Sequence, residues 1–174
     1  MAETKYGKYV IREPIQRSLR GTQGLHFCGE PTCLGAQHRG FPAEFTMHMI
    51  AHPHLMEENP HAHNSDQIIY VLGPNPSNLF EFDAEVELCL GEECEKQIID
   101  TASIVYVPKG MIHCPLKFAR VDKPIFFGHI DFSPEYGRSA GDVSAQAMAP
   151  HSKQWTKYTP EEADKMRGRT LRKS

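Results

Sequence analysis

The chain has 174 residues, of which 40% are hydrophobic and 24% are charged, a composition typical of one globular domain with a single core. Its net charge of −3 provides no general attraction to nucleic acid, and no apolar run approaches the roughly 20 residues that a membrane span requires. The first residues lack the apolar stretch of a signal peptide. We therefore expect a cytoplasmic protein without nucleic-acid or membrane partners.

The five cysteines form an odd set without a secretory signal, which predicts thiols in a reducing compartment. Cys28 and Cys33 flank the sequence G-E-P-T, so they could form a structural zinc knuckle or, as the loose spacing favours, be ordinary loop thiols. Cys89 and Cys94 flank the hairpin-turn sequence L-G-E-E. Their Cα atoms could approach disulfide distance, but the expected compartment predicts that the two thiols stay unbonded.

Residues 1–43 are expected to be an N-terminal segment that packs on the main domain. Tyr9–Ile11 could be a short strand. The stretch Gly21–Gly40 contains five glycines and a proline without a sustained apolar period, which predicts a long loop over one end of the domain.

Residues 44–133 carry the pattern of a β domain, because short apolar or alternating runs recur between turn signals. Closely spaced strands of this kind predict an all-β sandwich or barrel. The expected strands lie around Phe45–Ala51, Gln67–Leu72, Ala84–Leu90, Gln97–Ile99, Ser103–Val107, Pro115–Phe118 and Pro124–Phe132.

Residues 134–174 are expected to form a C-terminal extension with one short helix. Thr159 is a good N-cap, Pro160 suits the first helical position, and Glu162 completes a capping box, so a helix is expected from Pro160 to about Arg167. The final residues, R-G-R-T-L-R-K-S, are basic. They could be a solvated tail or could dock on the acidic barrel of the same or a partner subunit.

Histidines form the most informative pattern. His61 and His63 are two residues apart, so they share one face of a strand. The later sequence P-K-G-M-I-H places His113 at the start of a second strand, from which it can converge on the same point. Imidazole suits zinc, iron, nickel and copper, so a metal site is the leading hypothesis.

These motifs, H-x-H-x3-(E/Q) followed by P-x-G-x2-H in a run of short strands, resemble those of the cupin superfamily. The resemblance covers roughly residues 44–133 and implies a double-sheet, jelly-roll-like barrel with a metal at its mouth. It also implies that the metal ligands are His61, His63, His113 and the residue at position 67, with Pro108 and Gly110 forming the turn that presents the last histidine.

The sequence departs from the family pattern at several positions. Gln67 replaces the usual carboxylate, Leu55 and Ala102 replace glycines, Lys117 replaces an asparagine, and Gly73 comes one residue early. None of these changes alters the histidines. A glutamine leaves the full charge of a divalent metal in place, which favours an anionic substrate; Gln67 could be a weak ligand or could hydrogen-bond a bound water or substrate.

Two further side chains are candidates for catalysis. Counting by alternation from His113, Lys117 should face inward, where it could bind a carboxylate or act as an acid; alternatively it reaches the solvent. His48 could be a general base, a hydrogen-bond donor to a ligand, or a structural histidine. Asp66 should face away from the barrel unless a bulge reverses it.

We expect a metal-dependent enzyme that acts on a small oxygenated or carboxylated metabolite, by dioxygenase, isomerase, hydrolase or decarboxylase chemistry at a three-histidine site. The metal could be iron, manganese, zinc or nickel. The alternative is a non-catalytic barrel that binds or senses a small ligand. The family resemblance further implies a homodimer.

Overall fold

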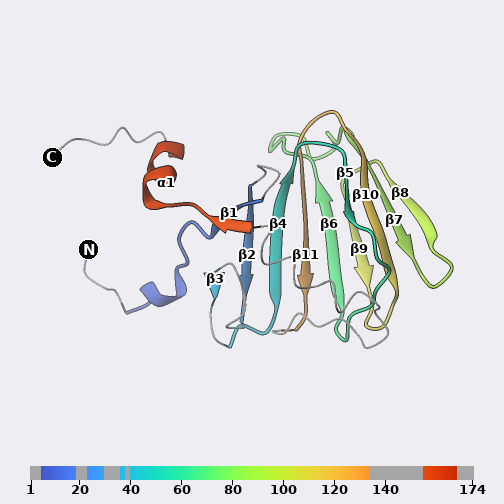
Figure 1. Ribbon diagram of the computed structural model, residues 1–174, viewed down its shortest axis with the longest axis horizontal. Coiled ribbons are helices and arrows are strands. Elements are labelled where there is room, and N and C mark those ends of the chain that lie inside the picture. Colours follow the sequence, from blue (N-terminus) through green and yellow to red (C-terminus); the bar gives the residue numbers. More distant parts are fainter. Residues whose placement is uncertain (1–4, 19–22, 30–35, 38–39, 134–154, 168–174) are drawn as a thin grey trace.

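The computed structural model describes residues 5–18, 23–29, 36–37, 40–133 and 155–167. Two antiparallel sheets form the body of the protein, as Figure 1 shows. The larger sheet has the strand order β12-β1-β2-β4-β11-β6-β9, with β3 beside β2. The smaller sheet has the order β5-β10-β7-β8. The all-β architecture of two sheets with a short C-terminal helix, predicted from the sequence, is therefore present.

The strands match most of the predicted runs. In the larger sheet they are β1 (Ile15–Ser18), β2 (Gln23–Cys28), β3 (Ala36–Gln37), β4 (Glu44–Ile50), β6 (Gln67–Leu72), β9 (Ser103–Val107), β11 (Ile125–Asp131) and β12 (Trp155–Lys157). In the smaller sheet they are β5 (His54–Glu57), β7 (Ala84–Leu90), β8 (Glu95–Ile99) and β10 (His113–Val121).

The N-terminal segment was predicted incorrectly in two places. Tyr9–Ile11 is not a strand, and a short 3-10 helix, η1 (Gly7–Tyr9), ends at Tyr9 instead. The predicted loop at Gly21–Gly40 contains β2, which pairs with β4 along five residues. The pairing satisfies the backbone of this glycine-rich stretch, a tertiary gain that its weak periodicity did not indicate. The domain boundaries at residues 43 and 133 remain a prediction.

The apolar core lies between the two sheets. Strands β4, β6 and β7 alternate buried and half-buried side chains, as their sequences predict. Phe118 of the smaller sheet packs edge-on against Phe127 of the larger sheet, with ring centres 5.2 Å apart. Other core side chains include Ile50, Val71, Val86, Leu88, Leu116 and Ile125.

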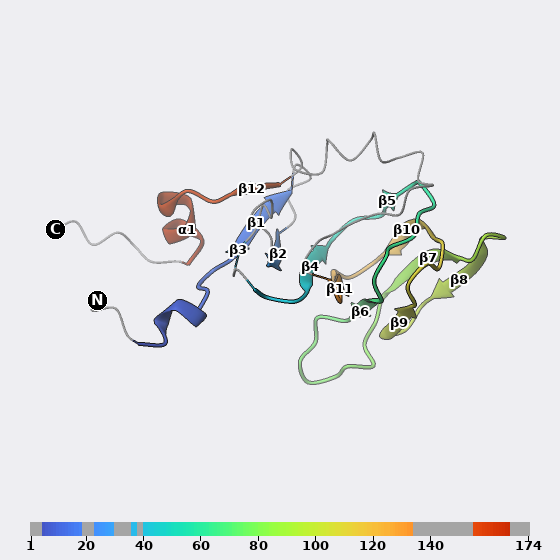
Figure 2. The ribbon, with the colours of Figure 1, turned by 90° about the horizontal axis from the view of Figure 1, so that it is seen from below.

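The C-terminal helix α1 (Pro160–Met166) begins with the predicted capping box, in which Thr159 and Glu162 each bind the other's backbone N–H. The helix lies beside the edge of the larger sheet that is formed by β12 and β1, away from the smaller sheet in both views (Figures 1 and 2). Among the described residues, no helix is long and apolar enough to cross a membrane.

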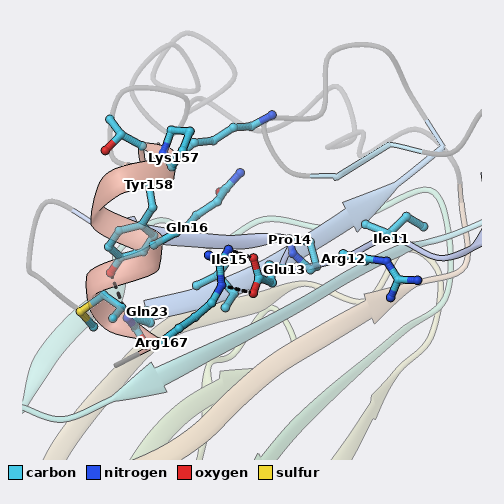
Figure 3. Close-up of a pocket in the computed structure, with 14 residues that line it drawn as sticks. Ile11, Arg12, Glu13, Pro14, Ile15, Gln16, Gln23, Lys157, Tyr158 and Arg167 are labelled. Atoms are coloured by element: carbon cyan, nitrogen blue, oxygen red, sulfur yellow. Dashed lines mark hydrogen bonds and ion pairs between the residues drawn. The ribbon is translucent and has the colours of Figure 1, made fainter. Parts of the chain in front are cut away.

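Helix α1 docks on the N-terminal strands of its own chain. Gln23 donates a hydrogen bond to the Tyr158 hydroxyl at 3.0 Å, Arg17 forms an ion pair with Glu162 at 2.8 Å, and Arg167 pairs with Glu13. Figure 3 shows the groove between these elements, with a volume of about 570 Å³. Within this chain, the described part of the extension thus docks on the N-terminal segment; the basic tail from residue 168, to which the docking prediction applies, lies outside the described residues.

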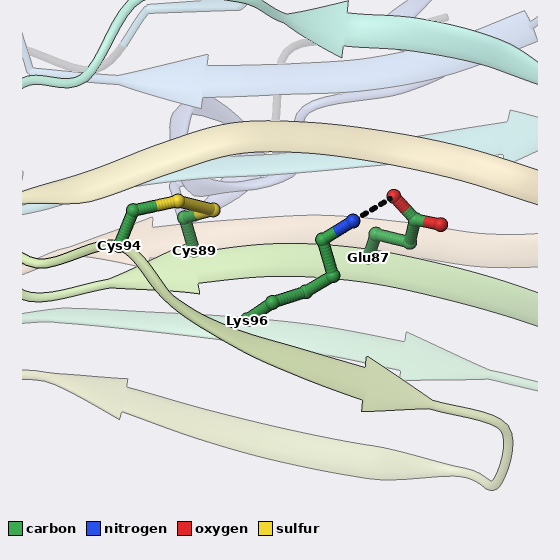
Figure 4. Close-up of a disulfide and its surroundings, with 4 residues drawn as sticks. All are labelled: Glu87, Cys89, Cys94 and Lys96. Carbon is green, nitrogen blue, oxygen red and sulfur yellow. Dashed lines mark hydrogen bonds and ion pairs between the residues drawn. A yellow bond between two sulfur atoms is a disulfide. The ribbon is translucent and has the colours of Figure 1, made fainter.

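The hairpin between β7 and β8 is closed by a disulfide between Cys89 and Cys94, seen in Figure 4 beside the Lys96–Glu87 ion pair. The prediction that these thiols stay unbonded is therefore wrong. It rested on the expected compartment, whereas the antiparallel hairpin brings the two Cα atoms to 4.6 Å, within the range of a disulfide. The predicted zinc knuckle includes Cys33, which lies outside the described residues.

Candidate metal centre

The three predicted histidine ligands are brought together by backbone pairing. His61 and His113 exchange hydrogen bonds, with the His61 N–H donating to the His113 carbonyl at 3.0 Å and the reverse bond at 2.9 Å. The Gly110 N–H donates to the His63 carbonyl at 2.9 Å. His61 forms only an isolated bridge, and β6 begins at Gln67, so the first histidines precede the strand that was predicted to carry them.

The three imidazoles face one another inside the protein. Their exposed fractions lie between 2% and 5%, and their ring centres are 4.5 Å (His61–His113), 5.0 Å (His61–His63) and 5.1 Å (His63–His113) apart. Imidazoles that share one ion at metal–nitrogen distances of about 2.0–2.1 Å have ring centres about 4.5–5.5 Å apart. The observed spacing fits three ligands of one metal ion.

Backbone carbonyls fix which ring nitrogen faces the centre. The Nδ1 atom of His61 lies 2.9 Å from the Asn59 carbonyl, and the Nδ1 atom of His113 lies 3.2 Å from the Met111 carbonyl. A carbonyl only accepts, so each Nδ1 carries the hydrogen and each Nε2 carries the lone pair. Metal-binding histidines almost always have such a second hydrogen bond.

Gln67 is buried at the start of β6, four residues after His63. Its Nε2 donates to Asp131 Oδ1 at 3.0 Å, and its Oε1 is buried without a hydrogen-bond partner among the described residues. An unsatisfied buried acceptor carries a free-energy cost of about 1–3 kcal/mol, which a metal ion or a ligand donor would remove. The orientation set by Asp131 therefore presents an oxygen, not an amide N–H group, as the remaining interaction site.

Asp66 supports the turn that carries His113. Its Oδ1 accepts from the Lys109 N–H at 2.8 Å, and the Met111 N–H donates to the Pro108 carbonyl at 3.0 Å. Gly110 adopts a φ of +81°, a conformation that glycine reaches without steric cost. The predicted role of Pro108 and Gly110 in a presenting turn agrees with this geometry, and Asp66 is exposed as expected.

Cys114 is a potential ligand that the sequence analysis missed. Among the described residues, one group of three possible ligand atoms lies within 4.8 Å of one another, and it consists of His61, His113 and Cys114. His63 is not a member of this compact group, although its ring packs against both other histidines. The signal in the sequence was a cysteine directly after a predicted ligand; simple alternation placed it on the opposite face.

A second set of buried polar side chains lines the interior of the larger sheet. His26 contacts Glu44 at 2.8 Å, and His129 contacts Asp131 at 3.3 Å and Glu44 at 3.8 Å. Gln67 also donates a hydrogen bond to Asp131. These contacts form a continuous series of polar side chains from β2 to Gln67. Glu44 and Asp131 were missed, yet each is an acidic residue in the buried phase of its strand.

The electrostatics of this set follow from burial and pairing. Burial raises the pKa of Glu44, but hydrogen bonds and charge from His129 and His26 outweigh it and lower the pKa to about 2. Burial lowers the pKa of His129, but the hydrogen bond to Glu44 and the charge of Asp131 raise it above its ordinary value. Burial raises the pKa of Asp131 despite the nearby His129. The raised pKa of His129 favours the protonated ring, which is attracted to the ionised Glu44 carboxylate.

Lys117 does not face the interior, contrary to the prediction. Strand β10 has a register shift against β7 between His113 and Leu116, where it contains one extra residue, and this bulge reverses the expected alternation. Leu116 and Phe118 are buried, whereas Lys117 is exposed. A side chain on the outer surface cannot bind a substrate inside the barrel. The structure therefore contradicts the predicted catalytic role of Lys117 and agrees with the alternative that it reaches the solvent.

His48 lies on the interior face of the larger sheet, but in a different row of paired residues from Gln67. It is opposite Phe127, whereas Glu44, four residues earlier on β4, is opposite Asp131 in the row of Gln67. Four residues of strand span about 13 Å. Burial, together with the charges of His129 and His26, lowers the pKa of His48 to about 3. A neutral, weakly basic imidazole in this row suits a structural role better than the predicted general base.

No protein-family model and no curated protein matches the sequence. Among solved structures, the chain is similar to KdgF from Halomonas sp., with 16% identity over 70% of this chain and 89% of that chain and a TM-score of 0.43. It is also similar to recombinant oxalate oxidase in complex with glycolate, with 12% identity over 70% and 56% of the two chains and a TM-score of 0.44.

A further match is FeII HppE, with 12% identity and a TM-score of 0.39, over 53% of this chain. The matched region spans 44% of that chain, less than half of its length. These likenesses concern the fold alone. The chemistry of the candidate centre rests on the residues of this chain.

Proposed function

We propose that the protein is a metal-dependent enzyme that acts on a small oxygenated or carboxylated metabolite. The observation that carries the proposal is the buried triad of His61, His63 and His113, whose rings have the mutual spacing of ligands to one ion. In two of the three, a backbone carbonyl also fixes the tautomer that binds metal.

The chemistry that a bound divalent metal supplies here is Lewis-acid polarisation of an oxygen and a lowered pKa of bound water. The residues of the chain have separate tasks. The three histidines would hold the ion, and Gln67 would offer it a neutral oxygen. Asp131 holds the Gln67 amide in the orientation that makes this oxygen available.

Charge favours an anionic substrate. The four predicted ligands, His61, His63, Gln67 and His113, are neutral when they bind, so they leave the charge of the ion uncompensated. The nearby Asp131 carboxylate contacts His129, whose raised pKa favours the protonated ring. A carboxylate or enolate of a small metabolite would supply the negative charge that position 67 lacks.

The experiment that tests this proposal begins with elemental analysis of the purified protein, where about one divalent metal per chain is expected. The metal-loaded protein is then offered a panel of small hydroxy acids, keto acids and dihydroxybenzoates, and product formation is followed by mass spectrometry. Multiple turnovers that stop on addition of a chelator support an enzyme. A protein that takes up no divalent metal contradicts the proposal.

A non-catalytic role in binding or sensing is the second candidate, favoured by the replacement of the usual carboxylate with Gln67. Calorimetry on the same panel separates the two. Stoichiometric binding of a compound that is recovered chemically unchanged would favour the binding role over catalysis.

Replacing Asp131 by alanine is expected to weaken metal binding about 10–100-fold, the usual range for loss of a group that orients a metal ligand. Without its acceptor, the Gln67 amide is no longer held with Oε1 toward the centre. Asp131→Asn keeps an acceptor oxygen and should recover most of the affinity. Titration with Zn²⁺ against a fluorescent chelator measures both variants; equal weakening in the two would assign the effect to charge and would contradict a positioning role.

Homodimerisation and cytoplasmic location remain predictions from the sequence. Size-exclusion chromatography with light scattering at several protein concentrations tests the first. A mass of one chain across the whole range would contradict the expected dimer.

A further inference from the structure

We propose that Cys114 is a thiolate ligand of the same metal, completing a set with His61 and His113. This inference rests on the proposed metal centre and deepens it, because a sulfur ligand selects the class of metal. Three observations carry it: the backbone conformation at Cys114, its burial beside His113, and the convergence of its sulfur with two histidine nitrogens.

The backbone turns Cys114 toward the centre. Consecutive residues of a strand normally point to opposite faces, yet His113 and Cys114 are both buried. The register of β10 shifts between His113 and Leu116, and Cys114 has a φ of +74°, in the left-handed region that residues other than glycine rarely adopt. Conformations of this kind are strained and cluster at functional sites.

The same bulge that places Lys117 outside thus places the Cys114 sulfur inside. The ligand atoms of Cys114, His61 and His113 lie within 4.8 Å of one another. Metal–nitrogen distances of about 2.0–2.1 Å and a metal–sulfur distance of about 2.3 Å put tetrahedral donors roughly 3.3–3.8 Å apart. The upper limit of 4.8 Å is about 1–1.5 Å above this spacing, and the His63 ring packs against both other histidines, where it could fill a further position.

A thiolate ligand compensates one charge of a divalent ion and leaves a net charge of +1, which still favours an anionic substrate. A thiol that coordinates a metal is deprotonated, so Cys114 would supply the single negative charge that the carboxylate at position 67 otherwise provides. A thiolate ligand also favours zinc and iron over manganese or magnesium, which prefer oxygen ligands. The structure thereby narrows the four metals considered from the sequence to a thiolate-binding ion such as zinc or ferrous iron.

Cobalt(II) substitution tests this inference with a spectroscopic readout that is independent of activity. The metal-free full-length protein, with its disulfide intact, is titrated with Co²⁺ under anaerobic conditions and followed by absorption. Visible ligand-field bands report binding, and an intense near-ultraviolet sulfur-to-cobalt charge-transfer band reports a thiolate ligand. The wild-type protein is expected to show both at about one cobalt per chain.

Two variants locate the sulfur. Cys114→Ser is expected to lose the charge-transfer band completely while the ligand-field bands persist, since His61, His63 and His113 remain. The double variant C28S/C33S is the matched control, because it removes two other cysteines and should keep the band. Circular dichroism of each variant verifies that the β fold is intact.

The outcomes separate this inference from the proposed function. Cobalt binding with ligand-field bands alone in the wild-type protein overturns coordination by Cys114 and leaves the metal centre standing. A charge-transfer band that survives in Cys114→Ser, or disappears in C28S/C33S, overturns it as well. Failure of the wild-type protein to bind cobalt or zinc overturns both proposals.

Discussion

Replacing His61 and His113 together by alanine is expected to abolish metal binding. The two residues are the members common to the three-histidine set and to the compact group with Cys114. Their loss leaves a single imidazole of the triad and removes both partners of Cys114, so the remaining side chains no longer provide a converging set of at least three ligands. Elemental analysis after metal loading should fall from about one equivalent per chain to background.

The same variant is expected to lose thermal stabilisation by metal. A ligand present at 100 times its dissociation constant stabilises the folded state by about 2.7 kcal/mol, which raises the Tm of a chain of this size by roughly 5–10 °C. The wild-type protein should show this rise with added Zn²⁺ and the double variant should not.

His52→Ala is the matched control, since His52 is an exposed histidine outside the centre. It should retain both the metal and the thermal shift. A double variant that keeps about one equivalent of metal would place the ion elsewhere in the chain.

Replacing Glu44 by glutamine is expected to destabilise the fold by about 3 kcal/mol near pH 6. The carboxylate is buried between His26 and His129, and removing one partner of a buried ion pair typically costs 3–5 kcal/mol. The fall in the pKa of Glu44 from 4.5 to about 2 corresponds to a similar value at about 1.4 kcal/mol per pKa unit. Urea unfolding of the metal-free proteins measures the difference.

The pH dependence of this difference has a definite sign. A lowered folded pKa means that Glu44 contributes its full stability above about pH 4.5 and loses it as the pH falls toward 2. The raised pKa of His129 means that its contribution is full below about pH 6.5 and is lost as the pH rises through the folded value. The gap between wild type and Glu44→Gln should therefore be widest between about pH 4.5 and 6.5.

Glu92→Gln, in the exposed turn of the β7–β8 hairpin, is the control and should change stability by less than about 0.5 kcal/mol. A wild-type protein whose advantage over Glu44→Gln persists unchanged to pH 2 would show that Glu44 is not held ionised by the two histidines.

Strand positions and histidine ligands were accessible to sequence reasoning because each depends on a local rule. Alternation of apolar residues located β4, β6 and β7. The spacing of His61 and His63, together with the P-x-G-x2-H pattern before His113, predicted the cluster that the structure contains. The capping residues Thr159 and Glu162 predicted the helix in the same way.

Errors arose where long-range pairing or a break in alternation decides the result. Part of the glycine-rich stretch Gly21–Gly40 forms β2 because its backbone pairs with β4. Lys117 is exposed and Cys114 is buried, the reverse of what alternation predicts. The reason is the bulge of β10 between His113 and Leu116, which turns the side chains after it to the other face. Cys89 and Cys94 were predicted to stay unbonded because of the expected compartment, whereas the geometry of the β7–β8 hairpin brings them together.

The sequence by itself determined the all-β fold, the histidine triad and the presence of glutamine at position 67, since these follow from residue types and short spacings. Only the tertiary structure decided what surrounds them. Asp131 orients the Gln67 amide, and the Glu44 carboxylate lies near the His129 ring. The left-handed backbone conformation of Cys114 turns its own side chain inward. Each of these depends on strands far apart in the chain or on one backbone angle, and neither property is encoded in a local sequence period.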